Sequence, residues 1–402
     1  MVHQLFLEAR DLLYFRDGRS VNDGSGAAWP SPSTAYSALL SAFHRTWTIP
    51  QEGEMIPDWG KKGGSLNGRF GGLKTFGPLP SRDGKIYVPT PADLRSRSIA
   101  APIRNVPGKA NFPAAVRYGI GSPEGASKET PNRWISMDDF ERYRTGDFRV
   151  ETLPDQAFFN SEARTGIALD EKGCAKDGMI YFSSYLRLYD DVRMCLFAEC
   201  DSICDSTRTD VIDRFFQKNP RRELLFGGQR GVVYTYQETF DSAKKANLLP
   251  PCKGKGHLVK WILLSPAIYS NGWLPKFIDP ASGKVLLRKC PRLNRRDFPS
   301  REAMQKERLK NSEEIRAYLV AAALPKTQHY SGWNMQKQRP ESTKLVVPPG
   351  SVYYFEAETE HDAALLSEVL SGNRYSDFYG PHGFGVGVCA PFEYYDFNLI
   401  SQ

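Results

Sequence analysis

The sequence contains few of the residues that build metal centres and hydrolytic sites. It has six histidines and seven cysteines in 402 residues. No two cysteines form a CxxC pair, and no histidine lies near the closest group, Cys195, Cys200 and Cys204, so reduced thiols are favoured over a metal site. HExxH, nucleophile-elbow and Walker motifs are absent as well. We therefore expect no metal, no cofactor and no conventional hydrolase chemistry.

Long apolar runs are also lacking. No stretch approaches the roughly 20 apolar residues that a membrane-spanning helix needs. The first residues, MVHQLFLEARDLLYF, meet charge too early for a signal peptide. A chain of 402 residues, 41% of them hydrophobic, can build two globular domains or one domain with large insertions. These features predict a cytoplasmic protein with no membrane partner.

Acidic residues are in the minority, and the imbalance is uneven along the chain. Lys and Arg number 53 against 46 Asp and Glu, which gives a formal charge of +7. Residues 284–311 are strongly basic, whereas 354–368 are acidic. Such an asymmetry is typical of a nucleic-acid partner, but a solvated basic face explains it equally well.

Glycine is concentrated near the C-terminus, in YGPHGFGVGV (379–388). A dinucleotide-binding fingerprint lies between a first strand and the helix that follows it. Here the remaining sequence is aromatic and strand-like. The glycines therefore lead into a last strand, and dinucleotide binding is excluded.

The periodicity of the first 240 residues predicts the order β-α-β-β-α-β, which is the ferredoxin-like motif. We expect strands at 3–8, 178–190, 191–200 and 230–240, with a tight turn at Asp190-Asp191, and helices at 33–47 and 209–219. Residues 48–177 do not fit this motif and are interpreted as a large insertion.

The second half repeats the same order. We expect strands at 257–269, 327–335, 351–358 and 384–397, and helices at about 301–323 and 360–370. Glycine clusters at 227–231 and 383–387 both fall between the second helix and the fourth strand of their half. The predicted fold class is therefore α+β. It has two ferredoxin-like domains, at 1–255 and 256–402, and a C-terminal glycine-rich loop at 380–388.

Eight short motifs, in order along nearly the whole chain, resemble one protein family. This family is the third subunit of the type III-B CRISPR effector (Cmr) complex, in the RAMP superfamily. The motifs are LLYFRDGRS (12–20), GPLPSRDGKIYVPTPADL (77–94), RWISMDDFERY (133–143), ARTGIALD (163–170), FGGQRG (226–231), LLSPAIYSNGWLP (263–275), SGWN (331–334) with VVPPGSVYYFE (346–356), and GFGVGV (383–388).

The resemblance implies a binding subunit with two ferredoxin-like domains. Such a subunit holds the 5′ handle of the CRISPR RNA, contacts the large polymerase-like subunit and the backbone RAMP subunits, and meets target RNA only indirectly. This chain departs from the family pattern at Gln229, where an acidic residue is common, and in the length of 48–177.

In an RNA-binding subunit, the glycine-rich loop can be explained as a phosphate-binding segment. Bare backbone at Gly383, Gly385 and Gly387 can bring phosphates close to several N–H groups. A plain strand bulge or close packing of a helix against a strand is the competing explanation. Phe384 either stacks on a base or faces the core, and His382 is placed to donate a hydrogen bond to RNA.

A second predicted phosphate site lies at the start of the first helix. Ser33 and Thr34 mark a helix N-terminus, whose unpaired N–H groups attract anions and also need an ordinary cap. Arg16 and Arg19 precede it in a loop that can fold over the same place. A salt bridge from either arginine to Asp17 or a neighbouring aspartate is the competing role.

Four further RNA contacts are predicted beside glycines, where an arginine can fork onto phosphate. They are Arg164 in ARTG, and Gly228, Gln229 and Arg230 in FGGQRG. Trp273 and Trp333 can serve as stacking platforms, but core packing is favoured for both.

Whether the chain can cleave RNA depends on whether one of its histidines can act as a general acid or base. A related class of RAMP proteins cuts CRISPR precursor RNA without metal and uses a histidine as general acid and base. His44 on the first helix and His382 in the glycine loop are the candidates here. A structural role is favoured for His44, so we expect a non-catalytic protein and keep a metal-independent endoribonuclease as the alternative.

Overall fold

A computed structural model describes most of the chain. The described residues are 2–15, 25–48, 70, 72–96, 98–106, 111–122, 132–169, 174–200, 210–238, 249–251, 256–291, 293, 297–334, 339–396 and 398. Arg16 and Arg19, two predicted RNA contacts, lie outside them. No helix among the described residues is long and apolar enough to cross a membrane.

The first sheet has eight strands, in the order β12-β13-β1-β11-β3-β4-β7-β8. Its strands are β1 (His3–Ala9), β3 (Leu73–Arg82), β4 (Lys85–Pro89), β7 (Trp134–Ser136), β8 (Thr152–Leu153), β11 (Val192–Cys200), β12 (Arg221–Leu225) and β13 (Val232–Glu238). β1 is central and antiparallel to both neighbours, with Leu5 opposite Leu196 of β11 and Gln237 of β13.

The second sheet has four strands, in the order β17-β22-β14-β23. They are β14 (Leu258–Leu263), β17 (Ala317–Ala323), β22 (Val352–Ala357) and β23 (Gly387–Pro391), and all neighbours are antiparallel. The helix α6 (Glu360–Leu370) matches its predicted range and connects β22 to β23.

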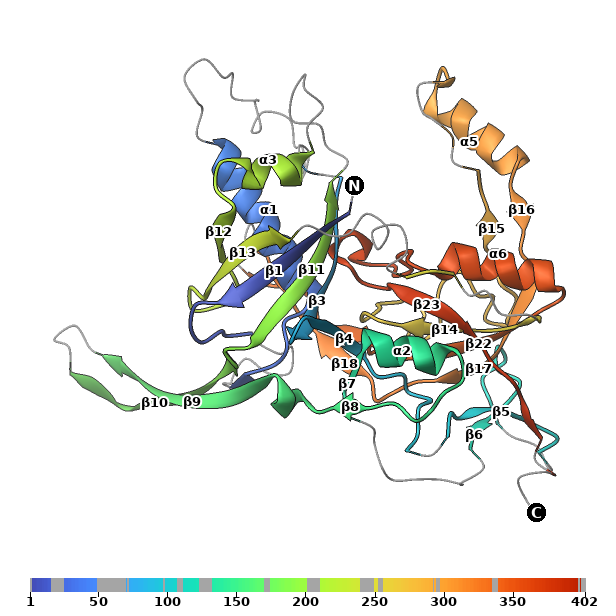
Figure 1. The fold of residues 1–402 in the computed structure, drawn as a ribbon, viewed down its shortest axis with the longest axis horizontal. Coiled ribbons are helices and arrows are strands. Elements are labelled where there is room, and N and C mark those ends of the chain that lie inside the picture. Colours follow the sequence, from blue (N-terminus) through green and yellow to red (C-terminus); the bar gives the residue numbers. More distant parts are fainter. Residues whose placement is uncertain are drawn as a thin grey trace.

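The two sheets pack face to face, with helices on the outer face of each (Figure 1). Alternation along β1 turns Leu5 and Leu7 towards the helices α1 (Pro32–Thr48) and α3 (Val211–Gln217). Phe6 points the other way, into a core shared with Ile262 and Tyr354 of the second sheet. The outer face of the second sheet buries Trp261 and Phe355 among residues that include those of α6.

The predicted second strand of the first half is wrong. Residues 178–190 were expected in the central sheet, but most of them lie in β10 (Ala175–Leu188), which pairs with β9 (Phe159–Leu169) and not with β11. The neighbour of β11 on the side away from β1 is β3, which lies inside the segment interpreted as an insertion. β9 and β10 form a long hairpin that projects from the body (Figure 1).

The predicted helix at 301–323 is only half correct. The helix α5 (Arg301–Lys310) covers the charged part of this range, but AYLVAAA becomes the strand β17. Leu319 of β17 is fully buried in the outer core of the second sheet, and Val320 and Ala321 are fully buried in the core shared with the first sheet. Burial on both faces therefore outweighs the helix propensity of alanine.

The remaining elements are short. They are β2 (Ser25–Gly26), β5 (Ala101–Arg104), β6 (Ile120–Gly121), β15 (Arg288–Lys289), β16 (Glu313–Glu314), β18 (Gln328–Tyr330), β19 (Trp333–Asn334), β20 (Arg339–Pro340), β21 (Lys344–Val346), β24 (Tyr395–Asp396), and the 3-10 turns η1 (Asp155–Ala157) and η3 (Gly380–His382). β18, and not β17, occupies the range predicted as the second strand of the second half.

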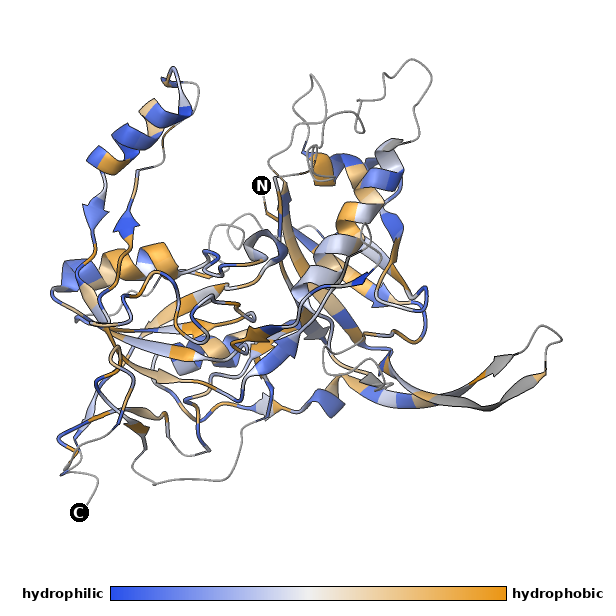
Figure 2. Cartoon of the chain, turned by 180° about the vertical axis from the view of Figure 1, so that it is seen from behind, coloured by the Kyte–Doolittle hydropathy of each residue, from blue (hydrophilic) through white to orange (hydrophobic). Residues whose placement is uncertain are grey.

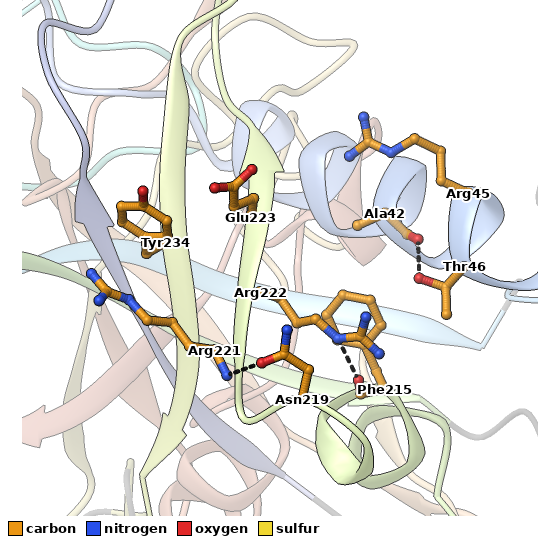
Figure 3. Close-up of a pocket in the computed structure, with 9 residues that line it drawn as sticks. All are labelled: Ala42, Arg45, Thr46, Phe215, Asn219, Arg221, Arg222, Glu223 and Tyr234. Carbon is orange, nitrogen blue, oxygen red and sulfur yellow. Dashed lines mark hydrogen bonds between the residues drawn. The ribbon is translucent and has the colours of Figure 1, made fainter.

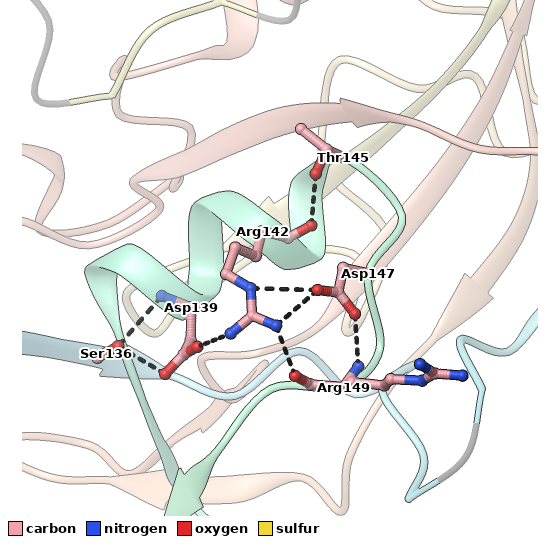
Figure 4. Close-up of polar contacts among 6 residues, drawn as sticks. All are labelled: Ser136, Asp139, Arg142, Thr145, Asp147 and Arg149. Atoms are coloured by element: carbon pink, nitrogen blue, oxygen red, sulfur yellow. Dashed lines mark hydrogen bonds and ion pairs between the residues drawn. The ribbon is translucent and has the colours of Figure 1, made fainter.

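The segment after β7 is held together by a polar cluster (Figure 4). Ser136 caps the helix α2 (Met137–Arg144) by accepting from the amide of Asp139 at 3.1 Å. Arg142 then joins Asp139, at 2.9 Å, to Asp147, at 2.7 Å. The Arg149 side chain points away from this cluster in Figure 4 and is exposed.

Candidate nucleic-acid interface

The structure brings two of the predicted phosphate sites into contact with each other. The Oγ of Ser33, at the start of α1, lies 2.8 Å from Nδ1 of His382 in the glycine-rich loop. The His382 ring also stacks on Tyr36, with ring centroids 3.9 Å apart and planes at 13°. The glycine-rich loop, which leads into β23 of the second sheet, therefore covers the N-terminal turn of α1.

The cap of α1 differs from the prediction. Ser31 accepts the Thr34 amide, with its carbonyl at 3.0 Å and its hydroxyl at 3.4 Å. Pro32 takes the first helical position, where a missing N–H costs nothing. Ser33, expected as cap and phosphate ligand, is instead buried under the loop.

His382 is uncharged near neutral pH. Burial lowers the pKa of His382 to about 4, because the charged ring would lose its hydration. The ring can therefore hydrogen-bond at pH 7 but adds no positive charge that would attract phosphate.

The amides of the glycine-rich loop are already used inside the protein. The amides of His382 and Gly383 donate to Tyr379 and Gly380, both at 2.9 Å. Gly385 donates to the Pro266 carbonyl at 2.8 Å. The amides of Phe384 and Val386 likewise have internal acceptors. The prediction that these N–H groups face phosphate is therefore wrong for residues 382–386.

The glycines of this loop permit close packing instead. A Cβ on Gly383 would lie 2.7 Å from the Thr75 carbonyl oxygen of β3, and one on Gly387 would lie 2.4 Å from Nε1 of Trp261. Gly385 has a φ of +73°, and a Cβ there would come within 2.2 Å of the backbone carbonyl oxygen of Tyr375. Close packing therefore accounts for all three positions, but the partners are strands and a loop segment and not the helix that the sequence-based alternative expected.

Phe384 is buried and cannot stack on a base in this conformation. Its side chain is 1% exposed and packs with Ile268 and Val346, against Tyr330 and Tyr379. The prediction of base stacking at Phe384 is therefore corrected, and the core position is the one observed.

The first glycine cluster is arranged differently. The loop 226–231 joins β12 to β13, and Gly228, Gln229 and Arg230 are exposed at its tip. Gln229 and Arg230 have φ angles of 53° and 55°, a left-handed conformation that costs about 1–2 kcal/mol for each such residue. The loop is fixed at its base because the Gly228 amide donates to the Tyr14 carbonyl at 2.8 Å.

Arg164 lies on the projecting β9–β10 hairpin. Its side chain is about half exposed, and its guanidinium is 3.1 Å from Glu162, which also binds Arg187 at 2.6 Å. A phosphate at Arg164 would therefore compete with this carboxylate.

The elements β15, α5 and β16 form a second projecting arm (Figures 1 and 2), and the basic segment 284–311 contains β15 and α5. It contains ten Lys and Arg against three Asp and Glu, so its formal charge of +7 equals that of the whole chain. No residue of α5 is buried. Within the described residues, the side chains of Arg301, Lys306, Arg308 and Lys310 have no hydrogen-bond or ion-pair partner.

Of the three other residues singled out in the sequence, two pack against neighbouring aromatic rings and the third has a side chain that is not described. Trp273 stacks on Tyr353 with ring centroids 6.5 Å apart, as part of the core of the second sheet. His44 packs edge-on against Phe70 at 5.1 Å. Trp333 lies in β19, but its side chain is outside the part that the structure describes.

One group has the side chains and spacing of a cation site. His3, Asp210 and Asp213 offer ligand atoms within 4.8 Å of one another. Nε2 of buried His3 is 3.2 Å from Asp210, which also accepts the Ile212 amide at the start of α3. Burial disfavours the Asp210 carboxylate, but these two hydrogen bonds outweigh it and lower the pKa of Asp210. The group ties β1 to α3.

Sequence reasoning missed three arginines that line a pocket of about 470 Å³ (Figure 3). They are Arg45 near the C-terminal end of α1 and Arg221 and Arg222 on β12. The only local signal was the pair of adjacent arginines in NPRREL (219–224).

Comparisons with solved structures give distant likenesses. One is a chain of the type III-B Cmr-beta complex bound to cognate target RNA and AMPPnP, with 12% identity over 89% of this chain and 86% of that chain, and a TM-score of 0.43. Another belongs to the Csm3-Csm4 subcomplex of a type III-A interference complex, with 11% identity, 97% and 99% coverage and a TM-score of 0.34. No curated protein matches the chain.

The family model for CRISPR-associated protein (Cas_Cmr3) matches residues 5–390. This match spans nearly the whole chain and agrees with the eight motifs found in the sequence. The chain therefore belongs to the Cas_Cmr3 family of CRISPR-associated proteins.

Proposed function

We propose that this chain is a non-catalytic subunit of a type III-B CRISPR RNA-guided effector complex. It binds the 5′ handle of the CRISPR RNA and links the large polymerase-like subunit to the backbone subunits. Membership of such a complex is supported by the family match over residues 5–390.

The proposal includes two ferredoxin-like units, at 1–255 and 256–402. In the motif, the strands are ordered fourth, first, third, second. The order β13-β1-β11-β3 in the first sheet and β23-β14-β22-β17 in the second supports it. The second unit departs from the motif because α5 lies in the projecting arm and does not cover the sheet.

The observation that carries RNA binding is the exposed loop 226–231. Gln229 and Arg230 hold a left-handed conformation at the surface, where no packing of their side chains explains it. Strain of this kind is common at ligand-binding positions. Neither residue has a hydrogen-bond partner among the described residues, so the Arg230 guanidinium is available for phosphate or a base edge.

The test compares two RNAs that differ only in the handle. The purified chain should bind RNA with the 5′ handle more tightly than the same RNA with that segment scrambled. Arg230→Ala should reduce this preference by about tenfold, because a charge-assisted hydrogen bond contributes about 1.5–3 kcal/mol. Arg149→Ala is the matched control, since Arg149 is also exposed. Equal binding of both RNAs by the unmodified protein would contradict the proposal.

The absence of catalysis is part of the proposal. It is supported by the low pKa of His382, about 4, which leaves little imidazolium to act as an acid at pH 7. Incubation with repeat RNA, with and without Mg²⁺, should give no cleavage. Specific cleavage that disappears in His44→Ala or His382→Ala would favour the endoribonuclease instead.

A further inference from the structure

The pocket between α1, α3 and β12 has the chemistry of an anion site. Its lining includes Arg45, Arg221 and Arg222, with Glu223 as the single acidic residue, and Tyr234 contributes an aromatic ring. The pocket is separate from the junction of α1 with the glycine-rich loop. Arg45 lies twelve positions after Ser33 on this helix, which is about 18 Å at 1.5 Å per residue.

The three arginines are held to different degrees. Arg222 is fixed, because its Nε donates to the Phe215 carbonyl at 2.9 Å and its guanidinium lies 4.8 Å from the Phe215 ring. Arg221 lies over Tyr234 at 4.0 Å and donates to Glu8 at 3.2 Å, yet its side chain is 55% exposed. Arg45 is exposed and has no side-chain partner among the described residues.

The guanidinium groups do not converge on one point. Figure 3 shows those of Arg45, Arg221 and Arg222 at separate places around the pocket. Separate guanidinium groups suit an extended chain with repeated charges better than a single small anion. Arg over an aromatic ring is also a surface on which a base can stack.

We propose that this pocket binds the phosphodiester backbone of a single-stranded nucleic acid, independently of its sequence. It is a second contact for the RNA of the proposed function, on the flank of the first unit. A guanidinium fork fits phosphate oxygens, and release of counterions from the strand drives such binding. An acidic protein segment is the competing ligand and is decided by the test.

The main variant is Arg45→Ala, because an exposed side chain with no partner in the described structure can be removed without loss of packing. The probe is a single-stranded RNA of about 20 nucleotides, measured with and without the handle between about 50 and 200 mM salt. The logarithm of the binding constant should lose about 0.7 of its slope against the logarithm of salt, the value per phosphate contact for single strands. The loss should be the same for both RNAs.

Arg149→Ala serves as the control for a change of one exposed charge, and Arg222→Lys as a second variant that keeps charge but loses the planar fork. Arg222→Lys should weaken binding of both RNAs by several fold, and it should lower Tm by only a few degrees through the lost bond to the Phe215 carbonyl. If Arg45→Ala has the same slope as Arg149→Ala, the proposal is overturned. It is also overturned if Arg45→Ala weakens binding of a poly-glutamate peptide but not of RNA.

The test of the pocket is independent of whether the protein recognises the 5′ handle. A protein that does not distinguish the two RNAs would contradict the proposed function. The pocket proposal would still hold if Arg45→Ala lowered the salt slope for both.

Discussion

Ser33 and His382 lie 349 residues apart in sequence, yet Oγ of Ser33 is 2.8 Å from Nδ1 of His382. The contact joins the helix α1, which covers the first sheet, to the loop before β23 of the second sheet. It places a neutral imidazole over the helix N-terminus, against the ring of Tyr36. Both side chains were predicted to bind RNA. In the structure they contact each other instead.

The His382 contact should make stability depend on pH. The folded pKa of about 4 lies below the ordinary value of 6.5, so the unfolded chain takes up a proton first as the pH falls. The contribution of His382 to the free energy of unfolding is therefore fully present above pH 6.5. It is lost as the pH falls from about 6.5 to 4, and the loss is on the order of 2–3 kcal/mol. Urea unfolding at pH 7 and pH 4.5 measures it. His382→Asn, which has no such proton, should lose less over the same range; an equal loss would contradict the assignment.

Gly385→Ala should destabilise the fold. The new Cβ would lie 2.2 Å from the Tyr375 oxygen at a φ of +73°, so we expect a loss of about 2–4 kcal/mol. Gly380→Ala is the control in the same loop, because its φ is ordinary and its nearest neighbour would be 3.9 Å away. Tm reports the difference. If Gly385→Ala keeps its Tm but loses preference for the handle, the loop binds RNA and its packing role is secondary.

The buried pair of Lys260 and Asp93 should be sensitive to the loss of one partner. Nζ of Lys260 is 2.7 Å from Asp93, and both are almost fully buried, with Tyr143 and Tyr354 also donating to the carboxylate. Asp93→Asn leaves an uncompensated ammonium and should cost about 3–5 kcal/mol. Adding Lys260→Met should restore part of this loss in a double-mutant cycle. Strictly additive effects would mean that the two charges do not stabilise each other.

The basic arm should contribute to RNA binding without contributing to stability. Replacing Arg301, Lys306, Arg308 and Lys310 together by Gln should leave Tm within about 2 °C, because no residue of α5 is buried. The salt slope of RNA binding should fall by about 0.7 for each phosphate that the variant no longer neutralises. An unchanged slope would identify the arm as a solvated face, the other explanation that the charge pattern allows.

Local patterns were enough to predict several elements. Apolar residues at helical spacing predicted 33–47, and the helix is Pro32–Thr48; the same holds for α6 at 360–370. Alternation predicted β1 and β13. The motifs, read in order, were enough to predict the family. These features are encoded within short windows, where side-chain periodicity and turn residues are visible.

Tertiary structure decided the conformation wherever the local sequence preference conflicts with long-range packing. AYLVAAA favours a helix locally, but burial on both faces of the second sheet makes it a strand. Residues 178–190 have strand character, which cannot say whether their partner is β11 or β9. The glycines of 383–387 are equally suited to phosphate and to close packing; the approach of β3 and Trp261, distant in sequence, selects packing. The sequence therefore determined the family and the local elements, and only contacts between distant segments decided which glycines are buried and which arginines share a pocket.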